Sequence, residues 1–381
     1  MNFLLRHIST ILEGYNAEIP LSVYLKSYFR SFPKLGSRDR RAISQAVYLY
    51  YRYCRRLPGD LDVFEVIFNA IQHSGPGSSF LETMLLRYDG NLPLKTTAII
   101  LREDQLPRLS GGIVPEDWHD SFLEQPQMFI RARKPGIPDQ LQKAGIPYSH
   151  CSGEESGLSP GACLALPNGT DLENLLPSED YVVQDWASQQ SVHFLLENCD
   201  LKPGKRVWDS CAGAGGKSLM VTDLAPGVKI LATDIRASIL SNLSGRFRRY
   251  HLPVPKTVVA DVSAPADLHT AIPRGKFDLI ICDVPCSGSG TWARTPEQYH
   301  FFKEESLKTM CARQLKITSN VVPFLRPGGT LAYITCSVFE EENEAIVSAI
   351  AGNHDLQVTS IKLIDGTKSG ADSMFVALLQ K

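Results

Sequence analysis

The chain has 381 residues, of which 43% are hydrophobic and 21% charged, and its formal net charge is −2. This composition is ordinary for a globular protein of two or three domains, and a nearly neutral chain can bind nucleic acid only through a local patch. Nine cysteines without a Cys-x-x-Cys pair favour neither a disulfide framework nor a metal site. No apolar run approaches the length of a membrane span, so we expect a cytoplasmic protein with reduced thiols.

The first hundred residues are predicted to be helical. The segment 1–12 places apolar side chains at helical spacing, which indicates an amphipathic helix rather than a signal peptide. A further helix is predicted after Ser37, with an apolar face formed by Ala42, Ile43, Ala46, Val47, Tyr50 and Tyr51. The basic residues around it are Arg38, Arg40, Arg41, Arg52, Arg55 and Arg56. They form either a solvated helix face or a surface for RNA phosphates, and the pattern leaves both open. A loop between helices is predicted at Gly75–Ser79.

A second unit is predicted from about Pro107 to Pro177. Residues 128–133 alternate as a strand does, and residues 139–145 are typical of a short helix with a glycine stop. The basic side chains beside the strand are Arg131, Arg133 and Lys134. We favour RNA contact for this unit over a purely connecting role. Turns are predicted at Gly157–Pro160 and near Pro177.

A glycine-rich turn then follows a predicted first strand at Val207–Cys211. The turn, Ala212–Ser218, leads into an apolar helix start, and this order lets the backbone approach a ligand closely. The spacing before Lys217 is too short for a Walker loop, and the turn also differs from the dinucleotide fingerprint. Taken alone, it fits either a tight connection or a binding loop.

Three more predicted strands end in an acid. They are Lys229–Asp234, Thr257–Asp261 and Phe277–Asp283. Asp234 lies some twenty residues after the glycine-rich turn, where sheets of this kind usually bind ribose hydroxyls. A single acid would more often cap a helix or face solvent. Three of them at strand ends favour a cofactor site.

Two cysteine motifs also close apolar strands. Asp283-Val284-Pro285-Cys286-Ser287-Gly288 follows one strand, and Thr335-Cys336-Ser337 follows another at residues 330–334. Residues just past the carboxyl ends of parallel strands line the ligand crevice, so both thiols are expected to face one pocket. Two thiols without a metal-ligand pattern suggest covalent chemistry on carbon.

With these motifs, the chain resembles the Nop/Sun family of S-adenosylmethionine-dependent RNA cytosine-5 methyltransferases. The resemblance rests on three segments, 209–217, 283–291 and 333–337, with Glu341-Glu342-Asn343-Glu344 behind the third. Residues 181–185 with Ser188 and Gln189 are similar to the segment that leads into the catalytic domain of this family. The likeness is strong from about Tyr181 onward and weaker before it.

The chain departs from the family pattern at two positions. Ala214 stands where the family usually has proline, which we expect to be mild because alanine holds an ordinary turn conformation. Ile239 stands where an arginine is frequent, so no binding role is assigned to it.

The resemblance implies a Rossmann-like class I methyltransferase domain at residues 179–381. It also implies a helical N-terminal domain at 1–105 and a small α/β RNA-binding subdomain at 106–178. The partner would be RNA of the bacterial ribosomal type, with no DNA and no membrane, and a monomer is expected. No motif separates ribosomal from transfer RNA.

The resemblance also assigns the site. Cys336 is the expected nucleophile, Cys286 assists release, and Asp283 contacts the base, the cofactor or both. S-adenosyl-L-methionine would be bound by the backbone of Cys211, Ala212, Gly213, Ala214, Gly215, Gly216 and Lys217, with Asp234 at its ribose and Asp261 by its adenine. Lys217 is expected to steady Asp283 electrostatically.

The chemistry needs these residue types. Carbon 5 of cytosine is a poor nucleophile until a thiolate adds to carbon 6, and a second group must then help to break the adduct. Cysteines inside apolar segments are expected to be inert packing, namely Cys54, Cys163, Cys199, Cys282 and Cys311.

Two other functions remain open at this point. In one, Cys286 attacks, as in DNA enzymes with a Pro-Cys motif. In the other, the chain is a non-catalytic RNA-binding assembly factor. The second cysteine argues against the first alternative, and the intact cysteines and acids argue against the second. An enzyme acting on amino groups would carry an Asn/Asp-Pro-Pro-Tyr motif where this chain has Asp283–Cys286.

Overall fold

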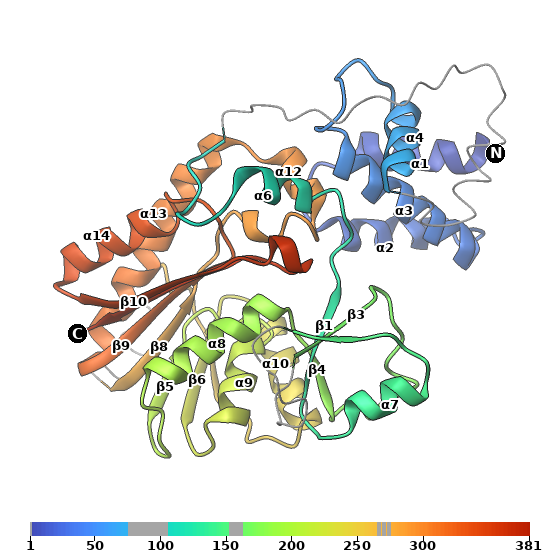
Figure 1. The fold of residues 1–381 in the computed structure, drawn as a ribbon. Helices are drawn as coiled ribbons and strands as arrows, with labels where there is room; N and C mark the ends of the chain where they lie inside the picture. Colours follow the sequence, from blue (N-terminus) through green and yellow to red (C-terminus); the bar gives the residue numbers. More distant parts are fainter. Residues whose placement is uncertain (1, 75–105, 152–162, 265–267, 269–271, 273–275) are drawn as a thin grey trace. The chain divides into compact units, whose positions relative to one another are not determined.

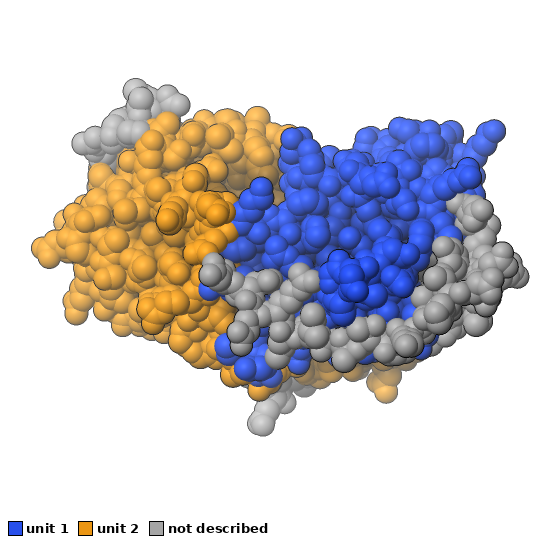
Figure 2. Space-filling model, turned by 90° about the horizontal axis from the view of Figure 1, so that it is seen from above, with its two compact units in different colours: residues 1–106, 115–125, 292–303 blue, residues 107–114, 126–291, 304–381 orange. Residues whose placement is uncertain are grey.

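The computed structural model describes residues 2–74, 106–151, 163–264, 268, 272 and 276–381 (Figure 1). The turns predicted at 75–79 and 157–160 lie outside the described residues. The chain divides into two compact units, coloured in Figure 2. One comprises residues 1–106, 115–125 and 292–303, and the other comprises residues 107–114, 126–291 and 304–381. The three-part division at residues 105 and 178 stays a prediction.

The first unit is helical. Its helices are α1 (Asn2–Gly14), α2 (Leu21–Ser31), α3 (Ser37–Tyr53), α4 (Val63–Ser74), α6 (Pro115–Ser121) and α12 (Pro296–Phe301). The predicted apolar face of α3 is buried, apart from Tyr50, which is half-buried, and it packs with α1, α2 and α4 in one core. Asp39 accepts a hydrogen bond from the Gly36 N–H at the start of α3, where an acid is favourable.

Two arginines of this unit are structural. Arg52 and Arg56 are only 4% and 3% exposed. Arg52 donates to the carbonyls of Phe122, Glu124 and Ala293 at 2.7–2.8 Å. Arg56 donates to the carbonyl of His119 and pairs with Asp120. Because these contacts are buried, Arg52 and Arg56 belong neither to a solvated helix face nor to a surface for RNA phosphates, and both predictions are wrong for these two residues. Arg38 and Arg41 are exposed, and RNA contact by them stays a prediction.

The second unit is built on a seven-stranded sheet in the order β10-β11-β9-β8-β5-β6-β7. Its strands are β5 (Arg206–Asp209), β6 (Lys229–Asp234), β7 (Lys256–Val259), β8 (Phe277–Asp283), β9 (Leu325–Thr335), β10 (Gln357–Ile364) and β11 (Met374–Gln380). The first five in chain order pair in parallel, while β11 pairs antiparallel with β9 and β10 with β11. The predicted strands are present, although β7 ends two residues before Asp261.

Helices cover both faces of this sheet (Figure 1). They are α8 (Trp186–Asn198), α9 (Gly216–Leu224), α10 (Ala237–Arg249), α13 (Glu304–Val321) and α14 (Glu344–His354), with short 3₁₀ turns at Ser289–Thr291, Val322–Phe324 and Thr367–Ser369. Alternate residues of β8 point to opposite sides: Leu279 and Ile281 pack with α8 and α9, and Ile280 and Cys282 pack with α13 and α14. A mostly parallel sheet covered on both faces is the predicted Rossmann-like α/β class. None of the helices in the described ranges is both long and apolar enough to cross a membrane.

A smaller antiparallel sheet in the same unit has the order β2-β3-β1-β4. Its elements are β1 (Met128–Ala132), α7 (Ile137–Lys143), β2 (Ser149–His150), β3 (Cys163–Leu166) and β4 (Tyr181–Val183). The predicted glycine stop of α7 is present at Gly145, whose φ is +68°. Residues 129–132 are all buried, so both faces of β1 are covered and the expected alternation of buried and exposed side chains is absent.

This burial corrects the RNA contact predicted for two basic residues of β1 and its end. Arg131 is 1% exposed, and its Nη2 lies 2.5 Å from the Asp223 carboxylate of α9. Arg133 donates to the same carboxylate through Nε and Nη2, at 3.0 and 2.9 Å. The two guanidinium groups therefore join the small sheet to α9. Lys134 is exposed, and its contact with RNA stays a prediction.

Candidate active site

The carboxyl ends of four parallel strands bring the predicted site residues to one edge of the large sheet. Neighbouring strands β6, β5, β8 and β9 run in the same direction. They end at Asp234, Asp209, Asp283 and Thr335. This is the edge at which open α/β sheets bind ligands.

The glycine-rich turn takes its shape from two left-handed residues. Gly213 and Gly215 have φ values of +53° and +77°, and α9 begins directly after them. A Cβ on Gly215 would lie 2.6 Å from Cγ of Leu243, so only glycine fits there. Ala214 has no left-handed conformation, and its carbonyl accepts a hydrogen bond from Arg246. The departure from proline at this position is therefore tolerated.

Asp234 lies beside this turn and already has several donors. Its carboxylate accepts from the N–H of Gly213 at 3.1 Å, the N–H of Arg236 at 2.9 Å and the Arg236 guanidinium at 3.1 and 3.3 Å. Burial raises the pKa of Asp234, but these hydrogen bonds outweigh it and hold the pKa below the usual value. Arg236 was not predicted: the family pattern has its arginine at the position of Ile239, whereas this chain carries one two residues after the acid.

Asp261 follows β7 after two further residues. The N–H and hydroxyl of Ser263 donate to its carboxylate at 2.9 and 2.7 Å. The hydroxyl bond is the main reason that the pKa of Asp261 is lowered. Its predicted place by the adenine stays a prediction.

Lys217 and Asp283 form an ion pair with an Nζ–Oδ2 distance of 2.6 Å, joining the glycine-rich turn to the Pro-Cys motif. Burial works to lower the pKa of Lys217, but the Asp283 carboxylate raises it above normal, so the lysine stays charged. Asp209, behind them, has one oxygen bonded to Ser218 at 2.6 Å and the other buried with no hydrogen-bond partner in the described chain. Burial raises the pKa of Asp209 to about 7.

The two predicted thiols meet. The sulfur atoms of Cys286 and Cys336 are 3.3 Å apart, and both side chains are half-buried. The Cys336 thiol, followed by burial, raises the pKa of Cys286 well above its usual range. Cys282 differs: it is fully buried within β8, and burial raises the pKa of its thiol to about 12, as suits a packing residue.

The main chain holds the two cysteine turns together. The Gly290 N–H donates to the Cys336 carbonyl at 2.9 Å, and the Ser373 N–H donates to the Gly290 carbonyl at 2.8 Å. A Cβ on Gly290 would lie 2.1 Å from the Ser373 carbonyl oxygen. Glycine is thus required where these three segments approach one another.

A buried polar network behind the thiols was not predicted. Ser289 and Ser337, each close to a cysteine, have hydroxyls 3.0 Å apart. Ser287 donates to Glu342, and Thr335 donates to Asn343. The serines beside the cysteines and the Glu-Glu-Asn-Glu segment were the available signals, but the serines bond to partners about 50 residues away, which could not be paired from sequence.

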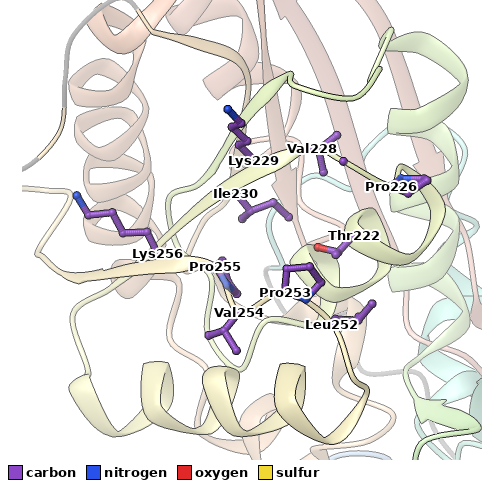
Figure 3. A pocket seen from close by; sticks show the side chains of 11 residues that line it. Thr222, Pro226, Val228, Lys229, Ile230, Leu252, Pro253, Val254, Pro255 and Lys256 are labelled. Atoms are coloured by element: carbon purple, nitrogen blue, oxygen red, sulfur yellow. The ribbon is translucent and has the colours of Figure 1, made fainter.

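A surface pocket of about 370 Å³ lies elsewhere (Figure 3). Its lining combines residues 226–230 and 252–256 with Thr222. Lys229 and Lys256 are the first residues of β6 and β7, so the pocket lies at the amino ends of these strands. It is therefore separate from the carboxyl edge that carries the thiols.

Known proteins are similar to this chain in sequence. Residues 197–379 match the family described as 16S rRNA methyltransferase RsmB/F. The ribosomal RNA small subunit methyltransferase B of Erwinia tasmaniensis is 33% identical over 266 residues, covering 67% of this chain and 58% of the relative. The protein of the same name from Salmonella arizonae is 34% identical over 62% of this chain and 54% of the relative. The matched part of the chain thus spans little more than half the length of these relatives.

Solved structures share the fold. PH0851 has a TM-score of 0.65 at 19% identity, with 95% of each chain covered. NSun6 from Pyrococcus horikoshii with SFG has a TM-score of 0.56 at 16% identity, with 70% of this chain and 94% of that chain covered. At these identities the likeness establishes the fold alone. Family membership rests on the sequence matches. Through residues 197–379 the chain belongs to the RsmB/F family, which confirms the predicted Nop/Sun type of methyltransferase.

Proposed function

We propose that the protein transfers a methyl group from S-adenosylmethionine to carbon 5 of a cytosine in ribosomal RNA, through a covalent adduct with Cys336. The observation that carries this proposal is the pair of thiols 3.3 Å apart at the carboxyl edge, beside the Lys217–Asp283 ion pair. The ribosomal substrate is supported by the names of the relatives. Transfer RNA is the alternative substrate.

The residues at the edge suit S-adenosylmethionine. A Cβ on Gly213 or Gly216 would meet nothing within 4 Å, so the turn leaves room beside its backbone, and one buried oxygen of Asp209 has no partner in the described chain. The backbone of 211–217 would hold the methionine portion, Asp234 the ribose and Asp261 the adenine side. The Arg236 guanidinium, on a side chain 62% exposed, would have to give up part of its contact with Asp234 to admit the ribose hydroxyls. When bound, the cofactor supplies a methyl group on a sulfonium, ready to be taken by a nucleophilic carbon.

Cys336 begins the reaction on the base. Its thiolate forms a bond to carbon 6, and the electron pair of the carbon 5–carbon 6 double bond moves to carbon 5, which becomes nucleophilic. Asp283, held in place by Lys217, would contact the base or the cofactor beside the reacting atoms. Carbon 5 then takes the methyl group and still carries its hydrogen.

Cys286 ends the reaction. The thiol of Cys336 is the largest influence that raises the pKa of Cys286, and that influence ends once the Cys336 sulfur is bonded to carbon. Cys286 can then lose its proton to solvent and accept the hydrogen of carbon 5 as a proton. The electron pair of the broken C–H bond restores the double bond and expels Cys336 as a thiolate, so the two cysteines act in sequence.

A denaturing gel tests these roles. With RNA and S-adenosylmethionine, Cys286→Ala should accumulate a protein–RNA complex that resists denaturant, because attack proceeds and release fails. Cys336→Ala should form no complex and transfer no methyl group. A complex in Cys336→Ala and none in Cys286→Ala would reverse the roles, as in DNA enzymes with a Pro-Cys motif. Bisulfite sequencing of RNA from cells with and without the gene would then identify the target nucleotide.

A further inference from the structure

Glu342 is a fully buried carboxylate directly behind the Cys286 turn, and the reaction described above does not use it. It lies between β9 and α14, six residues after Cys336, and is 0% exposed. Its Oε1 accepts from the Ser287 N–H at 2.9 Å and from Gln314 Nε2 at 2.8 Å. Its Oε2 accepts from the Ser287 hydroxyl at 2.5 Å. Glu342 thus holds both the backbone and the side chain of the residue that follows Cys286.

The environment of this carboxylate is unusual. A buried carboxylate is ordinarily paired with a cation, because its desolvation is costly. In the described chain, the three groups that donate to Glu342 are neutral. Negative charge on Glu342 is therefore left uncompensated by these donors beside the Cys286 thiol, and it adds to the effects of Cys336 and burial in raising the pKa of Cys286.

We propose that Glu342 is a positioning residue for Cys286: its carboxylate fixes the turn that carries the thiol and disfavours a second thiolate beside Cys336. The inference rests on the proposed function, in which the two thiols act at different times. If both were ionised before the base is bound, either sulfur could attack.

The charged groups around Cys286 differ from those around Cys336, as expected if the two thiols act at different times. The ionisable groups that act on Cys286 are Cys336 and Glu342, and Cys286 in turn adds to the effect of burial in raising the pKa of Tyr333. The Tyr333 hydroxyl donates to the Glu342 carbonyl, so it is part of the same buried cluster. Lys217, by contrast, forms an ion pair with Asp283 and interacts electrostatically with Asp209 and Cys336. A carboxylate with neutral donors therefore lies behind Cys286, whereas the lysine that interacts with Cys336 is already paired with a carboxylate.

Glu342→Gln separates charge from position. The glutamine oxygen can accept the two bonds that Oε1 accepts, and its amide can donate to the Ser287 hydroxyl, which then reverses its direction. The turn keeps its contacts and loses only the charge. Glu342→Asp keeps the charge, and Glu340→Gln is a matched control because Glu340 pairs with Arg108 and its side chain is 38% exposed.

The measurement is the rate at which iodoacetamide alkylates Cys286, followed by mass spectrometry of the Cys286 peptide between about pH 6 and 10. All variants carry Cys336→Ala, so that Cys286 reacts without a neighbouring thiol. Glu342→Gln should shift the rate profile to lower pH and raise the rate at neutral pH at least about threefold, because a thiolate no longer faces a negative charge. Glu342→Asp and Glu340→Gln should follow the parent. An unchanged or slower rate in Glu342→Gln, or equal profiles in Glu342→Gln and Glu342→Asp, would overturn the proposal.

The experiment needs neither RNA nor cofactor, so its outcome is independent of methyl transfer. If the proposed function is wrong, no protein–RNA complex accumulates on the denaturing gel, while the alkylation profile of Cys286 can still shift. With Cys336 present, Glu342→Gln should also lower kcat at least about threefold and leave KM for RNA unchanged, because a Cys286 thiolate formed too early competes with Cys336 for carbon 6 and does not affect RNA binding. A rise in KM at constant kcat would contradict this role.

Discussion

The carboxyl edge of the large sheet and the β1 strand of the small sheet both carry charged residues, but the structure uses them in opposite ways. At the carboxyl edge, Lys217 and Asp283 pair next to two half-buried thiols. On β1, Arg131 is buried and pairs with Asp223, joined by Arg133 from just beyond the strand. The charges at the carboxyl edge lie beside the thiols, whereas Arg131, inside a strand covered on both faces, is neutralised within the protein. The surroundings of a charged group, more than its residue type, therefore separate the two uses.

The comparison is sharpest at Asp283. Asp283→Asn keeps the shape of the side chain and removes the charge that Lys217 binds, so we expect methyl transfer to fall by about 100- to 10,000-fold with the fold intact. Single-turnover methyl transfer and thermal unfolding of the same preparation check this. Activity within about threefold of the parent would mean that Asp283 only anchors Lys217.

The opposite result is expected on β1. Arg131→Ala should lower the free energy of unfolding by about 3–5 kcal/mol, because it removes a buried side chain and takes from Asp223 one of its two arginine partners. Urea unfolding measures this loss, and the exposed Lys134→Ala is the matched control, with a change below about 0.5 kcal/mol. The salt dependence of RNA binding should be the same for Arg131→Ala as for the parent. A flatter slope with unchanged stability would restore Arg131 as a phosphate contact.

The smallest effect is expected at the cofactor. Asp234→Ala should weaken S-adenosylmethionine binding by roughly 1.5–3 kcal/mol through the loss of a charged hydrogen bond to the ribose. Calorimetry on the folded variant measures it. Asp234 could bind the ribose or only hold Arg236, and Arg236→Ala separates these two roles. This variant keeps the Asp234 carboxylate and removes its arginine partner, so it should change the affinity for S-adenosylmethionine by less than about 1 kcal/mol. Equal losses in both variants would indicate that Asp234 serves only to hold Arg236.

The large sheet could be predicted because its strands are apolar runs that end in polar residues. Phe277–Asp283 and Lys229–Asp234 were found at their observed limits for this reason. The meeting of Cys286 and Cys336 also followed, because the carboxyl ends of neighbouring parallel strands share one edge.

The failures have physical causes. A strand covered on both faces gives no reliable alternation, so the sequence of β1 did not reveal that Arg131 is buried. Arg52 and Arg56 satisfy main-chain carbonyls that are distant in sequence. The contact between Ser287 and Glu342 spans 55 residues and depends on the turn geometry. Such partners are set by tertiary structure and leave no local pattern.

The close approach at Gly290 has a consequence for how the chain folds. The two cysteine turns are bonded to each other, and Ser373, just before the last strand, is bonded to one of them. Strand β11 also lies between β9 and β10, so β9 has its second neighbour only when β11 has joined the sheet. During translation, a nascent chain that has already produced both cysteines still lacks this part of the site. These contacts can be complete only after residues 373–380 have left the ribosome, so a chain stalled before them carries both cysteines without the contacts of Ser373 and β11.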